Sequence, residues 1–401
     1  MLTGLILSVA PLRAQILIPG SGPGHEPNIF NSDLAVLEEQ ETRKDLPCTV
    51  TPSKPALGFD LKFHTGFQVT VPLKELAGGE NALNIIFRVS DQGHPDDPVY
   101  FTQHIRVPPI ENDAKGDAYL QGAFDVGEGS YHVDWLMRDR AERVCSFYWD
   151  SDAALSPKDK AIALAIGPGV IRRAGGDEFR EEPPVQREST EPPLNVKMLV
   201  NFAPQNSLSP ALQPLDTTAL VSILRTISRD PRIGRFSVVA FNMQEEKVIY
   251  RQDDVSRIDF PSLGHALAKL NLGTVNLQQL GDRHGDTEFL TNLVRKEMAP
   301  TPGDHPDALI FAGPKTLLDS NPPDEALKNA GDIDFPVFYM NYNLNPQAVP
   351  WRDAISHTVR FFRGYEYTIS RPRDLWFAVS EMVSKIVKSR NGRVAGAISS
   401  R

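Results

Sequence analysis

The sequence predicts a two-domain protein, with an N-terminal antiparallel β-sandwich and a C-terminal α/β domain built on a doubly wound, Rossmann-type parallel sheet. Polar and apolar residues alternate with a period of two from about Leu57 to Trp149. From Val196 onward, short apolar runs alternate with amphipathic helical patterns instead. A stretch dense in proline and charge, Gly175 to Pro193, separates the two regions.

Length and composition bound the class of protein. A chain of 401 residues is long enough for two or three domains, each with its own core. The net charge of -9 argues against a nucleic-acid partner, because nucleic-acid binders carry a basic footprint. No apolar run reaches the roughly 20 residues that a transmembrane helix needs. We therefore expect no nucleic-acid partner and no integral membrane segment.

Residues 1–14 resemble a signal peptide, because Leu5 to Ala10 is apolar and Leu12-Arg13-Ala14 could end in a cleavage site. The basic residues that normally begin such a peptide are missing, so a buried strand or helix is the alternative. The following residues, 15–46, are rich in Gly, Pro and acidic residues, and we expect them to be flexible. A signal peptide would make the protein secreted or periplasmic.

Residues 47–150 form the predicted β-sandwich, which we expect to be immunoglobulin-like. About seven short alternating segments, separated by breaks such as AGGEN and SDQGHPDD, are typical of such a domain. The domain contains both cysteines of the chain, Cys48 and Cys145. Their separation excludes a CxxC redox motif or a zinc knuckle. A disulfide between them and two buried free thiols are both compatible with the sequence.

Residues 151–194 are predicted to connect the domains. Ser156 to Ile166 has a helical pattern, with Ser156 as its N-cap and Pro157 at the first helical position. The proline- and glutamate-rich part that follows is predicted to be an exposed linker.

Residues 195–390 form the predicted α/β domain, and residues 391–401 a flexible tail. Four continuous apolar runs suit strands that are covered on both faces, namely Val196–Phe202, Ser237–Phe241, Ala308–Ala312 and Val337–Tyr342. Helical stripes lie between and after them, marked by Leu220 and Leu224, Leu263 and Leu267, Leu290 and Val294, and Leu375 to Ile386. The alternation predicts helices on both faces of one sheet.

The strand sequences VKMLVNFAP, FSVVAFNMQEEKVIY, PDALIFAGPKT and FPVFYMNYNL resemble the von Willebrand factor type A fold over about half the chain. In that family a DxSxS turn after the first strand, a Thr and a further Asp hold Mg²⁺. Here Asn201, Ala203 and Gln205 stand at the DxSxS positions, and Gly313 stands at the place of the Asp. Only Thr274 could match the Thr. The resemblance therefore implies a domain without the family's metal, and we expect no cofactor.

Ligands of open α/β sheets bind beyond the carboxyl ends of the strands. We expect that edge to form a binding surface for an unknown protein partner. Its candidate residues are Asn201, Pro204, Gln205, Asn206, Thr274, Asn276, Gly313 and Lys315. The alternative is that these residues only cap loops and helix ends. The leading hypothesis is a non-enzymatic secreted or envelope protein-interaction module.

Two other hypotheses remain open. A hydrolase-like enzyme could use His284 or His305, because each lies beside aspartates in a loop. No P-loop, GxSxG elbow or zinc-type histidine spacing supports such an activity. A structural envelope component could instead assemble through the edges of the β-sandwich.

Overall fold

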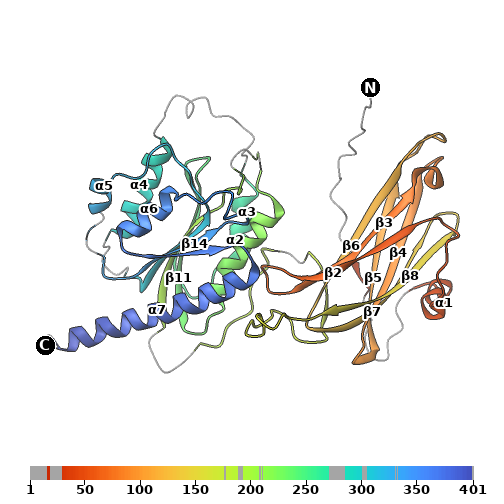
Figure 1. Ribbon diagram of the computed structural model, residues 1–401, viewed down its shortest axis with the longest axis horizontal. Coiled ribbons are helices and arrows are strands. Elements are labelled where there is room, and N and C mark those ends of the chain that lie inside the picture. Colours follow the sequence, from red (N-terminus) through yellow and green to blue (C-terminus); the bar gives the residue numbers. More distant parts are fainter. Residues whose placement is uncertain are drawn as a thin grey trace. The chain divides into compact units, whose positions relative to one another are not determined.

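The structure is a computed structural model that describes residues 16–18, 29–175, 178–187, 193–206, 209, 211–270, 285–299, 305–329, 331 and 333–399. The chain divides into two units, Met1–Gly176 and Asp177–Arg401. The first unit is built mainly of antiparallel strands, and the second has one mixed sheet with helices (Figure 1). A two-domain, sheet-rich protein is thus what the sequence predicted in outline.

The first unit contains two antiparallel sheets. One has the order β1-β5-β4-β7-β8, and the other has the order β2-β3-β6-β9. The bounds of the first sheet are β1 Ile16–Leu17, β4 Asn81–Asp91, β5 His94–Val107, β7 Gly129–Arg138 and β8 Val144–Ala153. Those of the second are β2 Thr49–Leu57, β3 Phe63–Pro72, β6 Asp117–Val126 and β9 Ile171–Arg173, with a 3-10 turn, η1, at Leu73–Leu76.

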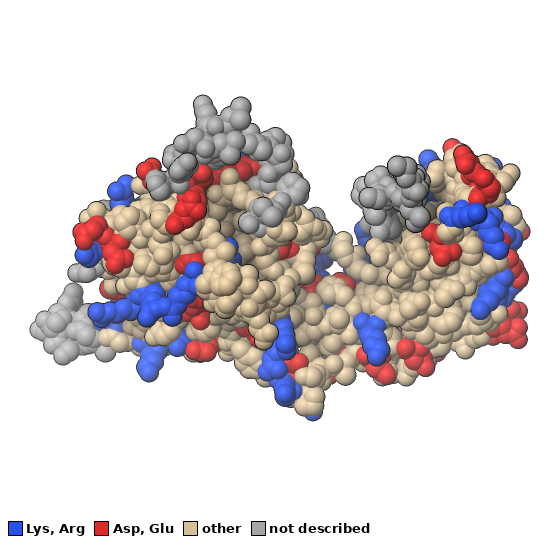
Figure 2. Space-filling view, turned by 45° about the horizontal axis from the view of Figure 1, so that its top comes forward, with Lys and Arg blue, Asp and Glu red and all other residues tan. Residues whose placement is uncertain are grey.

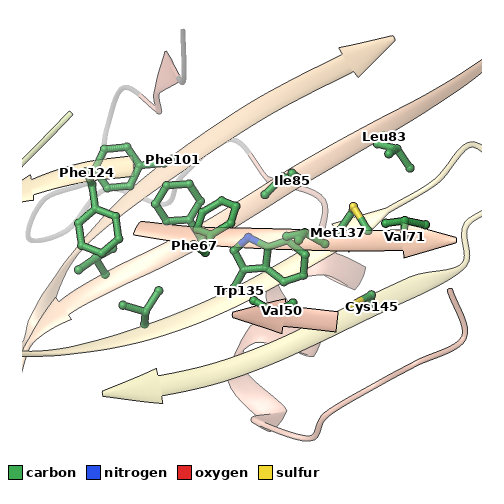
Figure 3. Packing of buried hydrophobic residues seen from close by; sticks show 14 of the residues in the cluster. Val50, Phe67, Val71, Leu83, Ile85, Phe101, Phe124, Trp135, Met137 and Cys145 are labelled. Atoms are coloured by element: carbon green, nitrogen blue, oxygen red, sulfur yellow. The ribbon is translucent and has the colours of Figure 1, made fainter. Parts of the chain in front are cut away.

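Both sheets contribute to one core, which makes this unit a sandwich (Figure 3). Phe67 of β3 lies in edge-to-face contact with Phe87 and Trp135 of the opposite sheet, at centroid distances of 5.3 Å and 5.5 Å. Such geometry suits the quadrupoles of aromatic rings. Tyr131, Val133 and Trp135 of β7 also belong to this core, because the alternation of the strand turns these side chains inward.

A disulfide joins Cys48 to Cys145, whose Cα atoms are 6.3 Å apart. Cys48 immediately precedes β2 and Cys145 lies on β8, so the bond links the start of one sheet to a strand of the other. Of the two alternatives that the sequence left open, the structure contains the disulfide.

The expectation that residues 15–46 are flexible is wrong for the part that the structure describes. Helix α1, Asn31–Glu39, packs Val36 and Leu37 against the outer face of the five-stranded sheet. The buried carboxylate of Asp33 accepts a 2.7 Å hydrogen bond from Nε of Arg138 on β7. Composition alone did not reveal this helix, because its stability comes from tertiary contacts and not from its own sequence.

The prediction of a helix at Ser156–Ile166 is also wrong. Two consecutive turns form there. The backbone N–H of Asp159 donates to the carbonyl of Ser156, and the backbone N–H of Ile162 donates to the carbonyl of Asp159. Ser156 Oγ donates to the Asp159 carboxylate at 2.6 Å, so the local side-chain bond favours a turn over a helix.

Residues 178–187, which we call the docked segment, were expected to be exposed linker but pack on the second unit. The carboxylate of Glu182 is buried and forms ion pairs of 2.8 Å with Arg225 and Arg229. Arg187 donates to the backbone carbonyls of Ser228 and Asp230 at 3.3 Å and 2.9 Å. The high charge of this stretch therefore serves contacts with a helix rather than solvation.

The second unit has a six-stranded sheet in the order β12-β11-β10-β13-β14-β15. All neighbours are parallel except the edge strand β12, which pairs antiparallel with β11. The bounds are β10 Leu194–Asn201, β11 Ile233–Asn242, β12 Lys247–Val255, β13 Ala308–Pro314, β14 Val337–Tyr342 and β15 Tyr365–Ile369. Each of the four predicted apolar runs coincides with one of the parallel strands, and only Phe202, one residue past β10, lies outside them.

Helices cover both faces of this sheet (Figure 1). The helices α4 Gly285–Met298, α5 Asp324–Lys328 and α6 Ala354–Phe361 share a hydrophobic core with Leu199, Val239 and Leu309 of the sheet. The helices α2 Pro214–Ser228, α3 Phe260–Leu267 and α7 Pro372–Ser399 belong to the other group, in which α2 contacts α7 and three strands. Burial on both faces explains the continuous apolar character of these strands.

The C-terminal tail predicted at 391–401 is instead part of α7 as far as Ser399. Arg393 anchors the helix by pairing with Asp307 at 3.0 Å and with Asp334 at 3.4 Å. In the described part of the chain, no helix combines the length and apolarity required to cross a membrane.

Candidate functional site

The carboxyl end of the parallel strands is the site that the sequence predicted, and its centre is closed. Asn201, the last residue of β10, is buried. Its Nδ2 donates to Thr316 Oγ1 and its Oδ1 accepts from the backbone N–H of Met243, both at 3.2 Å. Both ends of the amide are therefore engaged inside the protein, where unpaired polar groups would be costly.

Gly313 touches Asn201 from the neighbouring strand β13. Its φ of +154° lies in a region that side chains rarely adopt, and an added Cβ would lie 2.8 Å from the Cβ of Asn201. An aspartate at position 313 would therefore force the two strand ends to shift. Thr274 and Asn276 lie outside the described residues, so the predicted absence of a metal here stays a prediction.

Burial corrects the predicted binding surface. Asn201, Pro204 and Gly313 are buried and cannot contact a partner directly. Gln205 is half-buried and donates from Nε2 to the carbonyl of Tyr342 at 3.4 Å. Asn206 is exposed. The described candidate residues lie at or just beyond the carboxyl ends of the strands, as the sequence predicted, but the sequence did not separate the interior residues from the surface ones.

Asp353, which the sequence analysis missed, organises this edge from the start of α6. Its Oδ1 caps the helix by accepting from the backbone N–H of Ser356 at 2.9 Å. Its Oδ2 accepts from the backbone N–H of Thr316 at 2.7 Å and from the hydroxyl of Tyr339 at 3.0 Å. Burial, with the charge of Asp353, raises the pKa of Tyr339 well above its usual value, so the hydroxyl keeps its proton. An Asp just before an apolar helical turn was the available signal.

Two large apolar side chains project from the loops that Asp353 joins. Leu317 is 54% exposed and Trp351 is 58% exposed. Lys315 ties the loops further, because its Nζ donates to the carbonyls of Val349 and Trp351, each at 2.6 Å. We call Lys315, Leu317 and Trp351 the rim. It combines a cation with exposed apolar surface at the end of the sheet where ligands of such folds bind.

The histidines of the hydrolase hypothesis gain little from the structure. His284 lies outside the described residues. His305 is exposed and precedes β13, whereas the rim follows the carboxyl end of that strand. Asp307 accepts from the backbone N–H of Asn195 at 2.9 Å and pairs with Arg393, so its carboxylate has a structural role.

A second polar cluster, in the first unit, was not predicted as a site. His64 of β3 lies between two carboxylates, with Nδ1 2.7 Å from Asp125 Oδ1 and Nε2 2.9 Å from Asp60 Oδ1. Lys62 Nζ lies 3.1 Å from Asp60 and 3.4 Å from Asp125. A Cβ at position 58 would overlap the His64 ring, so any other residue there would displace the ring or the carboxylate of Asp60. We call Asp60, Lys62, His64 and Asp125 the β3–β6 cluster.

The cluster holds His64 in its charged form. Burial disfavours a charged imidazole, but hydrogen bonds with Asp125 and Asp60, and the charges of both, raise the pKa of His64 to about 10. Burial raises the pKa of Asp60, but the contacts with His64 and Lys62 outweigh it and lower that pKa overall. His64 lies in β3, Asp60 and Lys62 lie in the turn before it, and the register of His64 opposite Asp125 brings the fourth member to them.

Charged side chains of both signs are scattered over the face of each unit seen in Figure 2.

Comparison with known proteins gives little further information. No family model matches the chain, and no curated protein does. A mutant of the PilB minor pilin from Streptococcus sanguinis aligns over 93% of this chain and 87% of its own, with 8% identity and a TM-score of 0.30. A β-glucuronidase from Bacteroides uniformis aligns over 76% of this chain and 39% of its own, with 9% identity and a TM-score of 0.19. Scores this low do not establish a common fold.

Proposed function

We propose that this protein is a non-enzymatic protein-interaction module that is secreted or located in the bacterial envelope. In this proposal, the first unit is an immunoglobulin-like sandwich. The second is a von Willebrand factor type A-like domain without that family's metal site, and it binds a protein partner through the rim.

The sheet order of the second unit supports the proposal. The first strand, β10, lies in the middle between β11 and β13, and the antiparallel strand β12 closes one edge. The chain therefore reverses direction across the sheet at β10, which is the kind of position where open α/β sheets bind ligands. Asn201 and Gly313 occupy that position and contact each other, so recognition falls to the residues around it.

The exposure of Trp351 and Leu317 carries the proposal. Tryptophan is enriched among the residues that contribute most to protein–protein affinity, because its large ring loses little conformational entropy when it is buried. The loops that carry both residues are held by the buried Asp353, so the rim is ordered before a partner arrives. Preorganisation of this kind lowers the entropic cost of binding.

The disulfide supports the proposed location. Disulfides persist in oxidising compartments such as the periplasm and the cell exterior. Cys48 and Cys145 are joined, and the chain has only these two cysteines. The signal peptide proposed at residues 1–14 lies outside the described residues.

Partner capture with matched variants tests this function. The full chain is immobilised and incubated with a native envelope extract, and bound proteins are cross-linked and quantified by mass spectrometry. Trp351→Ala and Leu317→Ala should each weaken capture of the same protein at least tenfold, a free-energy change of about 1.4 kcal/mol. Phe377→Ala is the control, because Phe377 is also exposed but lies on α7.

Two results would overturn the proposal. One is equal loss of capture in the rim variants and in Phe377→Ala, which would indicate non-specific apolar binding. The other is capture that is unchanged in both rim variants. A double variant of Gln205 and Asn206 extends the test to the polar residues beside the rim.

A further inference from the structure

The β3–β6 cluster contains the donor set of a metal site. One ligand atom each from Asp60, His64 and Asp125 lie within 4.8 Å of one another. Among the residues that the structure describes, these three form the one group of His, Cys, Asp or Glu side chains that are close enough together to hold a metal ion. One imidazole and two carboxylates, with further positions left for water, are a ligand set that suits Zn²⁺ and related ions.

The cluster already binds positive charge at this place. The ammonium of Lys62 lies between the two carboxylates, at 3.1 Å from Asp60 and 3.4 Å from Asp125. The carboxylate of Asp125 is only 2% exposed, so it needs this compensation in any state of the protein.

We propose that the β3–β6 cluster is a binding site for a divalent transition-metal ion of the Zn²⁺ class, with Asp60, His64 and Asp125 as ligands. Loading exchanges cations, because the ion takes the place between the two carboxylates that the ammonium of Lys62 occupies, and Lys62 moves away on its flexible side chain. Asp125 and Asp60 lie against different nitrogens of the His64 ring, so the ring turns to present one nitrogen to the ion, and any proton on that nitrogen leaves to solvent. The buried carboxylate of Asp125 stays beside a positive charge.

Access and ligand type define the class of ion. The side chain of His64 is 40% exposed, so an ion can reach the site from solvent and keep bound water. Ca²⁺ and Mg²⁺ prefer a full set of oxygen ligands, and a site in which one ligand is an imidazole nitrogen does not favour them. The site lies in the first unit and is independent of the rim.

Isothermal titration calorimetry of the full chain, first treated with EDTA and then dialysed, tests the proposal with ZnCl₂ as the probe. Wild type should bind one Zn²⁺ ion saturably, and Ca²⁺ should give no such isotherm. His64→Gln should weaken Zn²⁺ binding at least tenfold. His94→Gln is the matched control, because His94 forms a 2.9 Å pair with Asp91 but is highly exposed.

Lys62→Met distinguishes a metal site from an ion-pair cluster that is only structural. Removing the ammonium takes away the competing cation, so Zn²⁺ affinity should rise at least threefold in this variant. Circular dichroism checks that His64→Gln and Lys62→Met are folded, and Lys62→Met keeps all three ligands. The proposal is overturned if wild type shows no saturable Zn²⁺ binding, if His64→Gln binds as wild type does, or if Lys62→Met does not bind more tightly.

Discussion

The carboxylate of Asp353 accepts a hydrogen bond from the backbone N–H of Thr316 at 2.7 Å, across 37 residues of sequence. This bond joins the loop after β13 to the start of α6. Leu317 follows Thr316 directly and Trp351 lies two residues before Asp353, so the common presentation of Leu317 and Trp351 depends on one buried carboxylate.

Loss of that carboxylate should destabilise the second unit. Asp353→Ala removes the cap of α6 and leaves the backbone N–H of Thr316 without its acceptor, whereas the hydroxyl of Tyr339 keeps the carbonyl of Pro314 at 3.1 Å. We expect a loss of about 2–4 kcal/mol in the free energy of unfolding, measured by urea denaturation. Asp319→Ala, at an exposed position of the neighbouring loop, should stay within about 0.5 kcal/mol of wild type. Equal effects of the two substitutions would contradict the role assigned to Asp353.

The docked segment should stabilise the second unit through Glu182. Glu182→Gln weakens the pairs with Arg225 and Arg229, and we expect a loss of about 1.5–3 kcal/mol in unfolding free energy. Glu181→Gln is the control, because Glu181 and its partner Arg257 are both exposed. Such surface pairs contribute about 0–1 kcal/mol. If both variants unfold at the same urea concentration, the segment is not a structural part of this unit.

The disulfide should stabilise the first unit selectively. Cys48 and Cys145 are 97 residues apart in sequence, so the bond closes a long loop of the unfolded chain. Replacing both residues by alanine should cost about 2–5 kcal/mol. Thermal unfolding with a reductant should lower the transition of the first unit and leave that of the second, which contains no cysteine, in place. A shift of both transitions would count against this assignment.

The charged state of His64 makes stability depend on alkaline pH. Its pKa is about 10 in the folded protein and near 6.5 when unfolded, so folding favours the protonated form. The contribution is fully present below pH 6.5 and decreases as pH rises toward 10. We expect unfolding free energy, measured with EDTA present, to fall across this window more steeply in wild type than in His64→Gln. Parallel pH profiles for the two proteins would disprove the assignment.

Sheet edges disfavour assembly of the sandwich through strand pairing. The edge strand β2 contains Pro52, Lys54 and Pro55, and prolines and lysines at edges oppose pairing with another chain. The strand β8 forms one edge of the five-stranded sheet. Backbone hydrogen bonds of Leu46 with Val144 and of Ser146 with Arg43 connect this strand with the segment before β2. The structural-component hypothesis therefore has less support than partner binding by the rim.

Strong periodicity was the part of the sequence that could be interpreted locally. Val337–Tyr342 is apolar apart from Asn341, and the strand there has those bounds. The helix α1 and the docked segment could not be predicted, because polar composition hides the few contacts that fix them. Leu37 is buried against the sheet, and Glu182 is buried against α2. The helical pattern that begins at Ser156 was misleading because of a local contact. The hydrogen bond between the side chains of Ser156 and Asp159 favours turns over a helix.

By itself, the sequence determined that the first half is rich in strands and that strands and helices alternate in the second, because periods of two and 3.6 follow from local backbone geometry. It also located the edge of the sheet that contains Asn201 and Gly313. Only the tertiary structure decided which residues of that edge are buried, which cysteines are joined, and that Asp60 and His64 meet Asp125. These relationships depend on strand register and on contacts between residues far apart in sequence, and no local pattern encodes them.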